Sequence, residues 1–327
     1  MTYRVLITDY IWPSLDPERA VLGPVGAEIV EAPAGDEATL VCLAADCDAI
    51  ITCFAKVTPK VIDACPRCQL ISRYGIGLDN IAVDHATSLN IPVTNVPAYC
   101  VDEVSDHALA LTLACARKVT RWNALVHGGK WDSTVHMPLR RLRGQTFGIV
   151  GFGKIGRLVA AKARPFGFRI AVHDRFVPAD VVRAAGCDPM SLDEVFAQSD
   201  YISVHAPLTP ETERLVGERT LALMKPTAYV INTSRGGLVD VDALYAAVSS
   251  GRVAGAALDV MPSEPPDFEH PLLRHEHVIF SPHVAFYSEE SLVELQTTAA
   301  RAVATVLTGG IPEHIVNGIV PGRKRGG

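Results

Sequence analysis

The chain has 327 residues, of which 48% are hydrophobic and 20% charged, and its formal net charge is −6 at pH 7. This composition excludes a disordered chain, and the length is enough for two domains with separate cores. The acidic balance argues against nucleic acid or an anionic membrane as a partner. The basic run Arg323-Lys324-Arg325 is interpreted as a frayed tail.

We expect a cytoplasmic protein without a membrane segment. The longest charge-free stretch, Ala86 to Val101, is broken by prolines and is too short to cross a bilayer. Met1–Arg4 leads into the apolar run Val5–Ile7 without the layout of a signal peptide. Eight cysteines fit a reducing compartment, and most lie in apolar segments that predict buried thiols, namely Cys42, Cys47, Cys53, Cys100, Cys115 and Cys187.

The spacing Cys65-Pro66-Arg67-Cys68 needs a separate interpretation, because CxxC pairs bind zinc or carry out redox chemistry. A zinc site needs four ligands, and no second Cys or His pair lies at a suitable spacing. We therefore predict no metal site, and a redox role is the less favoured alternative.

Strand and helix patterns alternate along the first hundred residues. Helical spacing is found over Thr58–Ala64 and Asn80–Leu89. Short apolar runs predict buried strands at Val5–Asp9, Glu28–Val30, Ala49–Thr52, Leu70–Ser72 and Val93–Val96. This alternation predicts a parallel sheet covered by helices on both faces.

A long helix is predicted from about Val101 to Val126, and its apolar content suits a buried or interface helix. A second series of strands and helices begins at Gln145 and ends in a helix over Ser288–Leu307, and within it Ser191 and Glu194 have the spacing of a capping box. Its strands are predicted at Thr146–Val150, Arg169–His173, Tyr201–His205, Ala228–Asn232, Gly255–Leu258 and Val278–Ser281. We therefore predict the α/β class, with two doubly wound parallel sheets.

The segment Gly151-Phe152-Gly153-Lys154-Ile155-Gly156 matches the pattern GxGxxG, between a predicted strand and a predicted helix over Arg157–Phe166. Gly151 permits the sharp turn, Gly153 lets the backbone approach a pyrophosphate, and Gly156 lets the helix pack on the strand. The helix N-terminus offers N–H groups and the positive end of a dipole to the phosphates. Together these features predict a dinucleotide site.

Asp174 lies at the end of the next predicted strand. A carboxylate there accepts the adenosine ribose hydroxyls and repels a 2′-phosphate, so NAD is favoured over NADP. The neighbouring Arg175 would help to neutralise such a phosphate, which leaves the use of NADP open.

Polar side chains follow three later strands, at the point where ligands bind in a doubly wound sheet. These residues are Arg235 in Asn232–Gly237, Glu264 in Asp259–Pro265 and His283 in Ser281–Phe286. His is the side chain best suited to protonate a carbonyl oxygen at neutral pH, and a carboxylate fixes its tautomer. An Arg fork holds a substrate carboxylate in two parallel bonds. This set predicts hydride transfer to a 2-keto acid.

Further segments that match a known family are spread over nearly the whole chain. They are Gly75-Ile76-Gly77-Leu78-Asp79-Asn80-Ile81, Asn95-Val96-Pro97, the GxGxxG turn, His205-Ala206-Pro207-Leu208-Thr209, Asn232–Gly237, Asp259 with Glu264-Pro265, and Ser281-Pro282-His283. With them the chain resembles the D-isomer-specific 2-hydroxyacid dehydrogenases, in the branch of phosphoglycerate dehydrogenases and C-terminal-binding proteins. The resemblance implies a flavodoxin-like substrate domain of residues 1–99 and 288–327, into which a Rossmann NAD-binding domain of residues 100–287 is inserted. It places the active site in the cleft between the domains.

The resemblance also implies a role for each site residue. Arg235 would bind the substrate carboxylate, His283 would be the acid/base, and Glu264 would be its partner. The backbone N–H groups of Ile76 and Gly77 would help to hold the substrate carboxylate.

Cofactor contacts and a partner chain follow from the same resemblance. Asp259 would contact the nicotinamide carboxamide, and the helix that begins at Val101 resembles the family's dimer-forming element, so a homodimer is expected. Cofactor contacts are also assigned to Lys154, Ile155, His205, Pro207 and Thr233.

Departures from the family patterns bear on the substrate. Phosphoglycerate dehydrogenases carry an Arg where Thr52 stands, before Lys56-Val57-Thr58, so a cation for a substrate phosphate is missing here. Formate dehydrogenases have Gln where Glu264 stands, which speaks against formate. Phe286 stands where the corepressor relatives carry Trp, and an aromatic ring there favours an apolar keto acid. We therefore expect a small or apolar 2-keto acid.

Two alternatives remain open. The first is an NAD(H)-sensing, corepressor-like binding protein, against which the intact set of Arg235, Glu264 and His283 speaks. The second is a dehydrogenase of a different anion, such as phosphite.

Overall fold

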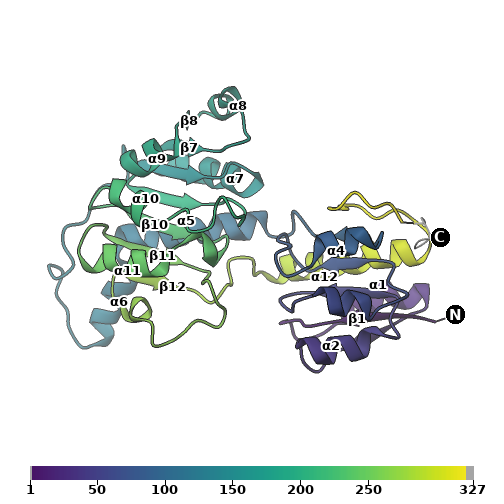
Figure 1. The fold of residues 1–327 in the computed structure, drawn as a ribbon. Coiled ribbons are helices and arrows are strands. Elements are labelled where there is room, and N and C mark those ends of the chain that lie inside the picture. The colour runs from purple at the N-terminus through teal and green to yellow at the C-terminus, as the bar shows by residue number, and fades with distance from the viewer. Residues whose placement is uncertain (1, 322–327) are drawn as a thin grey trace. The chain divides into compact units, whose positions relative to one another are not determined.

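The computed structural model describes residues 2–321, so the basic run Arg323–Arg325 lies outside the described residues. The chain divides into two compact units (Figure 1). The first unit is Met1–Tyr99 together with Ser288–Gly327, and the second is Cys100–Tyr287. Within residues 2–321, no helix has the length and apolar content needed to cross a membrane.

The first unit contains a parallel five-stranded sheet with the order β2-β1-β3-β4-β5. Its strands are β1 (Tyr3–Ile7), β2 (Ala27–Glu31), β3 (Ala49–Thr52), β4 (Ile71–Arg73) and β5 (Val93–Thr94). Its helices are α1 (Asp16–Leu22), α2 (Glu37–Ala44), α3 (Pro59–Asp63), α4 (Val83–Ser88) and α12 (Glu289–Leu307), with a 3₁₀ turn at Gly23–Val25. Every residue of β3 and β4 is buried, as expected for central strands of a parallel sheet.

The second unit contains a parallel seven-stranded sheet with the order β12-β11-β10-β9-β6-β7-β8. Its strands are β6 (Thr146–Val150), β7 (Arg169–His173), β8 (Asp188–Pro189), β9 (Tyr201–Val204), β10 (Tyr229–Asn232), β11 (Gly255–Leu258) and β12 (Val278–Phe280). Its helices are α5 (Val101–Arg117), α6 (Val119–His127), α7 (Lys154–Ala163), α8 (Ala179–Ala184), α9 (Leu192–Gln198), α10 (Glu218–Leu223) and α11 (Val241–Ser249). The 3₁₀ turns are Arg164–Phe166, Gly236–Leu238 and Pro271–Arg274.

Successive residues along the strands of the second unit pack into two separate apolar cores. Ile149 of β6 packs in the core that includes Val159 of α7. Val150, the next residue, belongs to the core that includes Leu244 of α11. Side chains that alternate along a strand point to opposite faces, so helices cover both faces of this sheet. The predicted α/β class with two doubly wound parallel sheets is confirmed.

The single helix predicted over Val101–Val126 is wrong, because α5 and α6 are separate helices. Lys118 between them has a left-handed backbone with φ of 52°. Its ammonium group donates hydrogen bonds to the carbonyl oxygens of His136 (2.7 Å) and Pro138 (3.3 Å). These distant carbonyls stabilise a backbone conformation that a residue with a Cβ rarely adopts.

Two other details differ from the sequence predictions. Cys42 is exposed, so its assignment to the core is wrong, whereas the other seven free cysteines are buried. The two-residue strand β8 has no strand pattern in the sequence, and its Pro189 suits an edge strand. The capping box of Ser191 and Glu194 is confirmed at the start of α9.

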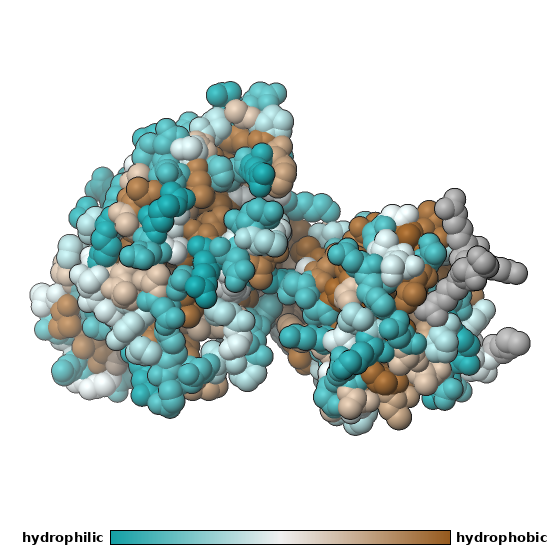
Figure 2. Space-filling model, viewed as in Figure 1, coloured by the Kyte–Doolittle hydropathy of each residue, from teal (hydrophilic) through white to brown (hydrophobic). Residues whose placement is uncertain are grey.

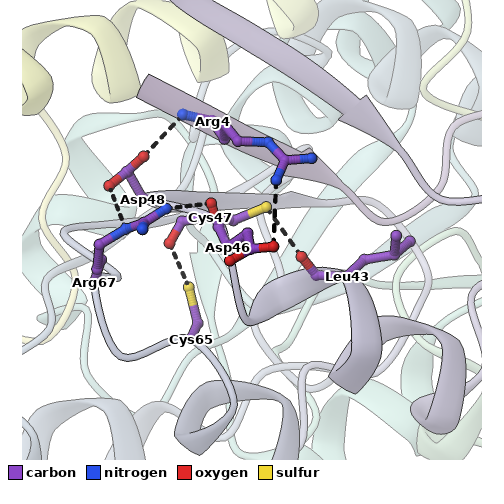
Figure 3. A network of polar contacts seen from close by, with 7 residues as sticks. All are labelled: Arg4, Leu43, Asp46, Cys47, Asp48, Cys65 and Arg67. Atoms are coloured by element: carbon purple, nitrogen blue, oxygen red, sulfur yellow. Dashed lines mark hydrogen bonds and ion pairs between the residues drawn. The ribbon is translucent and has the colours of Figure 1, made fainter. Parts of the chain in front are cut away.

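The CxxC segment belongs to a local network of the first unit (Figure 3). The thiol of Cys65 donates to the carbonyl oxygen of Cys47 (3.2 Å), and the thiol of Cys68 donates to that of Leu70 (3.5 Å). Both thiols of the CxxC segment are buried and donate to backbone carbonyl oxygens, so the network supports a structural role rather than a redox role.

Candidate active site

The glycine turn between β6 and α7 is shaped by close backbone contacts. Gly151 has φ of 97°, and a Cβ there would lie 2.6 Å from the backbone nitrogen of Ala206. A Cβ on Gly156 would lie 2.1 Å from the carbonyl oxygen of Gly151. A Cβ on Gly153, in contrast, would meet no atom within 4 Å. The fold itself therefore needs two of the three glycines, and the third has open space beside it.

Helix α7 begins at Lys154, not at the predicted Arg157, because Gly153 is its N-cap. No side chain caps this end. The first N–H groups of a helix have no partner within the helix, so those near Lys154 and Ile155 are available to an anion. This end of α7 therefore fits the pyrophosphate of a dinucleotide.

Asp174, after β7, ties the glycine turn to its own loop. Its Oδ2 accepts the N–H of Phe152 (2.6 Å), and its Oδ1 accepts those of Phe176 (2.8 Å) and Val177 (2.9 Å). Burial would raise the pKa of Asp174, but these backbone hydrogen bonds outweigh it and the pKa lies below its usual value. The carboxylate is therefore charged at neutral pH and has lone-pair room for a further donor.

Two polar atoms at the ends of β9 and β10 have no hydrogen-bond partner in the part of the chain that the structure describes. They are the buried Nδ1 of His205 and the buried Oγ1 of Thr233. Burial lowers the pKa of His205 to about 4, so the ring is neutral, and its Nε2 pairs with the hydroxyl of Ser203 (2.8 Å). Pro207 follows at the same strand end and is exposed. Buried polar atoms of this kind are suited to form hydrogen bonds with a bound ligand that has donors and acceptors of its own.

Glu264 and His283 form a pair in the loops that follow β11 and β12. Nδ1 of His283 lies 2.6 Å from Oε2 of Glu264, whose Oε1 accepts the N–H of Met261 (3.1 Å). Burial would raise the pKa of Glu264, but the hydrogen bond and charge of His283 outweigh it, with a smaller contribution from Arg235. The pKa of Glu264 therefore lies below its ordinary value.

Arg235 follows β10, and its half-buried side chain donates from Nη1 to the carbonyl oxygen of Ser234 (2.8 Å). Because β10, β11 and β12 are neighbours in the sheet, the three predicted catalytic residues follow adjacent strands. The effect of Arg235 on the Glu264 carboxylate agrees with this closeness. The ring of Phe286 lies edge-on to His283, with centroids 6.1 Å apart, and Phe286 is buried.

Asp259 has a fully buried side chain, and its own chain uses both of its oxygens. Oδ1 accepts the hydroxyl of Ser281 (2.5 Å) and the N–H of Val284 (3.0 Å), and Oδ2 accepts the N–H of Ala285 (2.9 Å). The predicted contact of Asp259 with the nicotinamide stays a prediction.

Ile76 and Gly77 lie in the first unit, in the loop after β4. Asn95 donates from Nδ2 to the carbonyl oxygen of Ile76 (2.8 Å), and the N–H of Val96 donates to that of Gly75 (3.0 Å). Within residues 2–321, neither the N–H of Ile76 nor that of Gly77 has a hydrogen-bond acceptor. Both N–H groups are therefore suited to an external anion.

Arg73 was missed by the sequence analysis, although it pairs with Thr52 across β3 and β4. Its buried guanidinium donates to Oδ1 of Asn80 (3.0 Å) and to the carbonyl oxygen of Tyr74, and it lies 6.0 Å from the ring centroid of Phe54. A cation is thus present beside Thr52, which weakens the argument against a phosphorylated substrate. The sequence feature that could have identified Arg73 is its position directly after the predicted buried strand Leu70–Ser72.

Residues 109–285 match the family model described as "D-isomer specific 2-hydroxyacid dehydrogenase, NAD binding domain". The chain belongs to this family. It is an NAD-binding oxidoreductase that transfers a hydride between 2-keto and 2-hydroxy acids. The glycine turn and the pair of Glu264 and His283 lie within the matched residues.

The dehydrogenase is also similar to characterised proteins along most of its length. It is 39% identical over 277 residues, or 83% of each chain, to a glyoxylate reductase of Korarchaeum cryptofilum. A solved NADPH-dependent glyoxylate/hydroxypyruvate reductase from Sinorhizobium meliloti, in complex with NADP and malonate, has a TM-score of 0.87 at 28% identity, covering 99% of this chain and 100% of that one. A D-lactate dehydrogenase from Aquifex aeolicus, complexed with NAD and lactic acid, has a TM-score of 0.85 at 28% identity, covering 94% and 96%. These similarities favour the enzyme over the NAD(H)-sensing alternative.

Proposed function

We propose that this dehydrogenase reduces glyoxylate or another small or apolar 2-keto acid with NADH, and that Arg235, Glu264 and His283 carry out the reaction. The observation that carries the proposal is the 2.6 Å contact between His283 and the charged Glu264, beside Arg235. When bound, NADH supplies the hydride for the keto carbon.

His283 donates a proton to the carbonyl oxygen from Nε2, because Nδ1 is held by Glu264. The Glu264 carboxylate fixes this orientation and stabilises the protonated imidazole before the transfer. The guanidinium of Arg235 binds the substrate carboxylate in two parallel bonds and aligns the carbonyl group. For the first unit, we propose that the N–H groups of Ile76 and Gly77, which have no acceptor within residues 2–321, bind an anionic group of the substrate.

For the cofactor, we propose that NAD binds at the glycine turn with contacts from Gly151–Gly156, His205, Pro207, Thr233 and Asp259. Asp174 has about four lone-pair positions, of which three accept backbone N–H groups, so one remains for a ribose hydroxyl. A charged carboxylate there disfavours a 2′-phosphate. The Sinorhizobium meliloti relative is NADPH-dependent, and Arg175 is exposed beside Asp174, so comparison of the two cofactors is part of the test.

A substrate panel tests the proposal. Oxidation of NADH and NADPH is measured with glyoxylate, hydroxypyruvate, phenylpyruvate and 3-phosphohydroxypyruvate, and reduction of NAD is measured with phosphite. We expect the highest kcat/KM with an unphosphorylated 2-keto acid, and at least about tenfold preference for NADH, or roughly 1.4 kcal/mol. Phosphite oxidation without 2-keto acid reduction would contradict the proposal.

We also propose a homodimer in which α6 and the segment after it take part. No residue of α6 is buried, and Val119 and Val126 are about half exposed. In the following segment Trp131 is 92% exposed and Met137 62% exposed. Figure 2 shows hydrophobic residues intermixed with hydrophilic ones on the visible surface. Apolar side chains exposed along one continuous segment suit a protein partner. Light scattering of the wild type and of Trp131→Glu tests this, with a monomeric variant expected.

The enzyme is proposed to work in the cytoplasm. All eight cysteines are free thiols, as expected in a reducing compartment.

A further inference from the structure

We propose that His107 is a positioning residue for the reaction, which acts through Ser281 and Asp259 on the segment that carries His283. The proposal rests on the proposed function, because it takes His283 as the proton donor. All the groups involved lie in the second unit. His107 itself is on α5, far along the chain from the other three.

A directed chain of hydrogen bonds connects α5 to the buried carboxylate. The hydroxyl of Ser281 donates to Oδ1 of Asp259 (2.5 Å). Since that bond uses the only hydroxyl hydrogen, Oγ of Ser281 accepts from Nε2 of His107, 2.9 Å away. His107 therefore fixes the rotation of the Ser281 hydroxyl toward Asp259.

Asp259 in turn organises the backbone on both sides of His283. Its carboxylate accepts the N–H groups of Val284 and Ala285, and its carbonyl oxygen accepts the N–H of His283 (2.7 Å). His283 has φ of 52°, in the left-handed region that disfavours residues with a Cβ. Such a conformation persists only when its surroundings hold it, so these hydrogen bonds determine where the imidazole lies.

Nε2 of His107 also lies close to a buried anion. The Asp259 side chain is fully buried, and Nε2 of His107 lies 3.5 Å from Oδ1. Among residues 2–321, no other basic side chain lies within ion-pair distance of Asp259. A buried carboxylate that loses a donor keeps its desolvation cost, so it will draw other donors toward itself. The backbone donors already in contact with it are the N–H groups of Val284 and Ala285, which follow His283 directly.

The test compares His107→Leu with His107→Gln. Leu removes the donor, whereas the amide of Gln can donate from a position near that of Nε2. We expect kcat to fall by about 10- to 100-fold in His107→Leu, since misplacement by about 1 Å costs up to 10²-fold. The Kd of NADH and the melting temperature should change little, and His107→Gln should recover most of the lost kcat.

A second measurement reads the position of His283 without turnover. In protein labelled with ¹³C-histidine, the ring resonance of His283 is identified by its loss in His283→Ala. We expect it to shift in His107→Leu and to return in His107→Gln. Ser281→Ala, which removes a single oxygen atom, should reproduce both the loss of kcat and the shift of the His283 resonance. It replaces His107→Leu in the test if that variant does not fold.

Asp106→Asn is the matched control, because Asp106 is exposed on the same helix and pairs with Lys162 (2.6 Å). It should match the wild type in kcat and in the His283 resonance. An active wild type with unchanged kcat and resonance in both His107→Leu and Ser281→Ala would overturn this proposal alone. A wild type inactive with every 2-keto acid would overturn the proposed function instead.

Discussion

The two parallel sheets differ most at the carboxyl ends of their strands. In the five-stranded sheet the polar groups that follow β1 and β3 satisfy one another. The hydroxyl of Thr8 pairs with that of Thr52 (2.8 Å), and the carboxylate of Asp9 accepts the N–H groups of Cys53 (3.0 Å) and Phe54 (2.7 Å). These groups hold loops together.

In the seven-stranded sheet the corresponding positions contain groups that their own chain does not satisfy. His205 and Thr233 each have a buried atom without a partner within the described residues, and the N-terminus of α7 has no side-chain cap. The pair of Glu264 and His283 follows two strands of the same sheet. Two similar sheets therefore differ in the residues at the ends of their strands, and it is these residues that suit the second sheet to binding a ligand.

The largest expected effect is at His283. His283→Ala should lower kcat by about 10²- to 10⁴-fold, because general acid catalysis typically contributes that much. The Kd of NADH, measured by fluorescence, should stay near the wild-type value. His277→Ala, at the other end of β12, is the control and should retain activity. Near-normal turnover in His283→Ala would assign the proton transfer to another group.

Substitutions in the glycine turn distinguish glycines that the fold requires from one that cofactor binding requires. Gly153→Ala should weaken NADH binding at least about tenfold, roughly 1.4 kcal/mol, with an unchanged melting temperature, since its Cβ meets no protein atom. Gly156→Ala should lower both NADH affinity and melting temperature, because its Cβ would overlap the Gly151 carbonyl. Calorimetry and thermal unfolding check this. Equal NADH affinity in Gly153→Ala and the wild type would place the cofactor elsewhere.

Phe286 tests the apolar character of the substrate. Phe286→Ala should raise KM for phenylpyruvate more than for glyoxylate, by severalfold, because each buried methylene is worth about 0.8 kcal/mol. Steady-state kinetics with both substrates give the ratio of their kcat/KM values. If Phe286 only packs against His283, the melting temperature will fall while that ratio stays the same.

The smallest effect is expected in the first unit, at the buried Glu18. Burial raises the pKa of Glu18, and hydrogen bonds from Tyr74 and Gln296, both 2.8 Å, only partly oppose it. The folded chain therefore binds more protons than the unfolded chain between the two pKa values, and the free energy of unfolding falls as pH rises through that range. Glu18→Gln should remove this dependence in urea unfolding. If the difference in free energy of unfolding between the wild type and Glu18→Gln does not change with pH, the raised pKa of Glu18 is contradicted.

Much of the fold could be predicted because its signals are local. Thr146–Val150, Arg169–His173 and Gly255–Leu258 are strands as predicted, since each is an apolar run of strand length before a turn or polar residues. The pairing of His283 with Glu264 could also be anticipated, because adjacent parallel strands end at the same edge.

What could not be predicted depends on residues distant in the sequence. The break at Lys118 depends on carbonyl groups some twenty residues later, at His136 and Pro138. His107 lies on a helix whose spacing does not show that it meets Ser281. The placement of Arg73 beside Thr52 depends on the register of β3 and β4, which the sequence does not show.

The most direct test of the account is the pH dependence of kcat/KM for 2-keto acid reduction in the wild type and in Glu264→Gln. The carboxylate of Glu264 stabilises the protonated imidazole of His283, so its loss should move the alkaline limb of the profile to lower pH, by about one unit or 1.4 kcal/mol. Melting temperatures and NADH affinities of the two proteins show that folding and cofactor binding are preserved. Superimposable profiles, or a limb that moves to higher pH, would contradict the assignment of Glu264 and His283 as the acid/base pair.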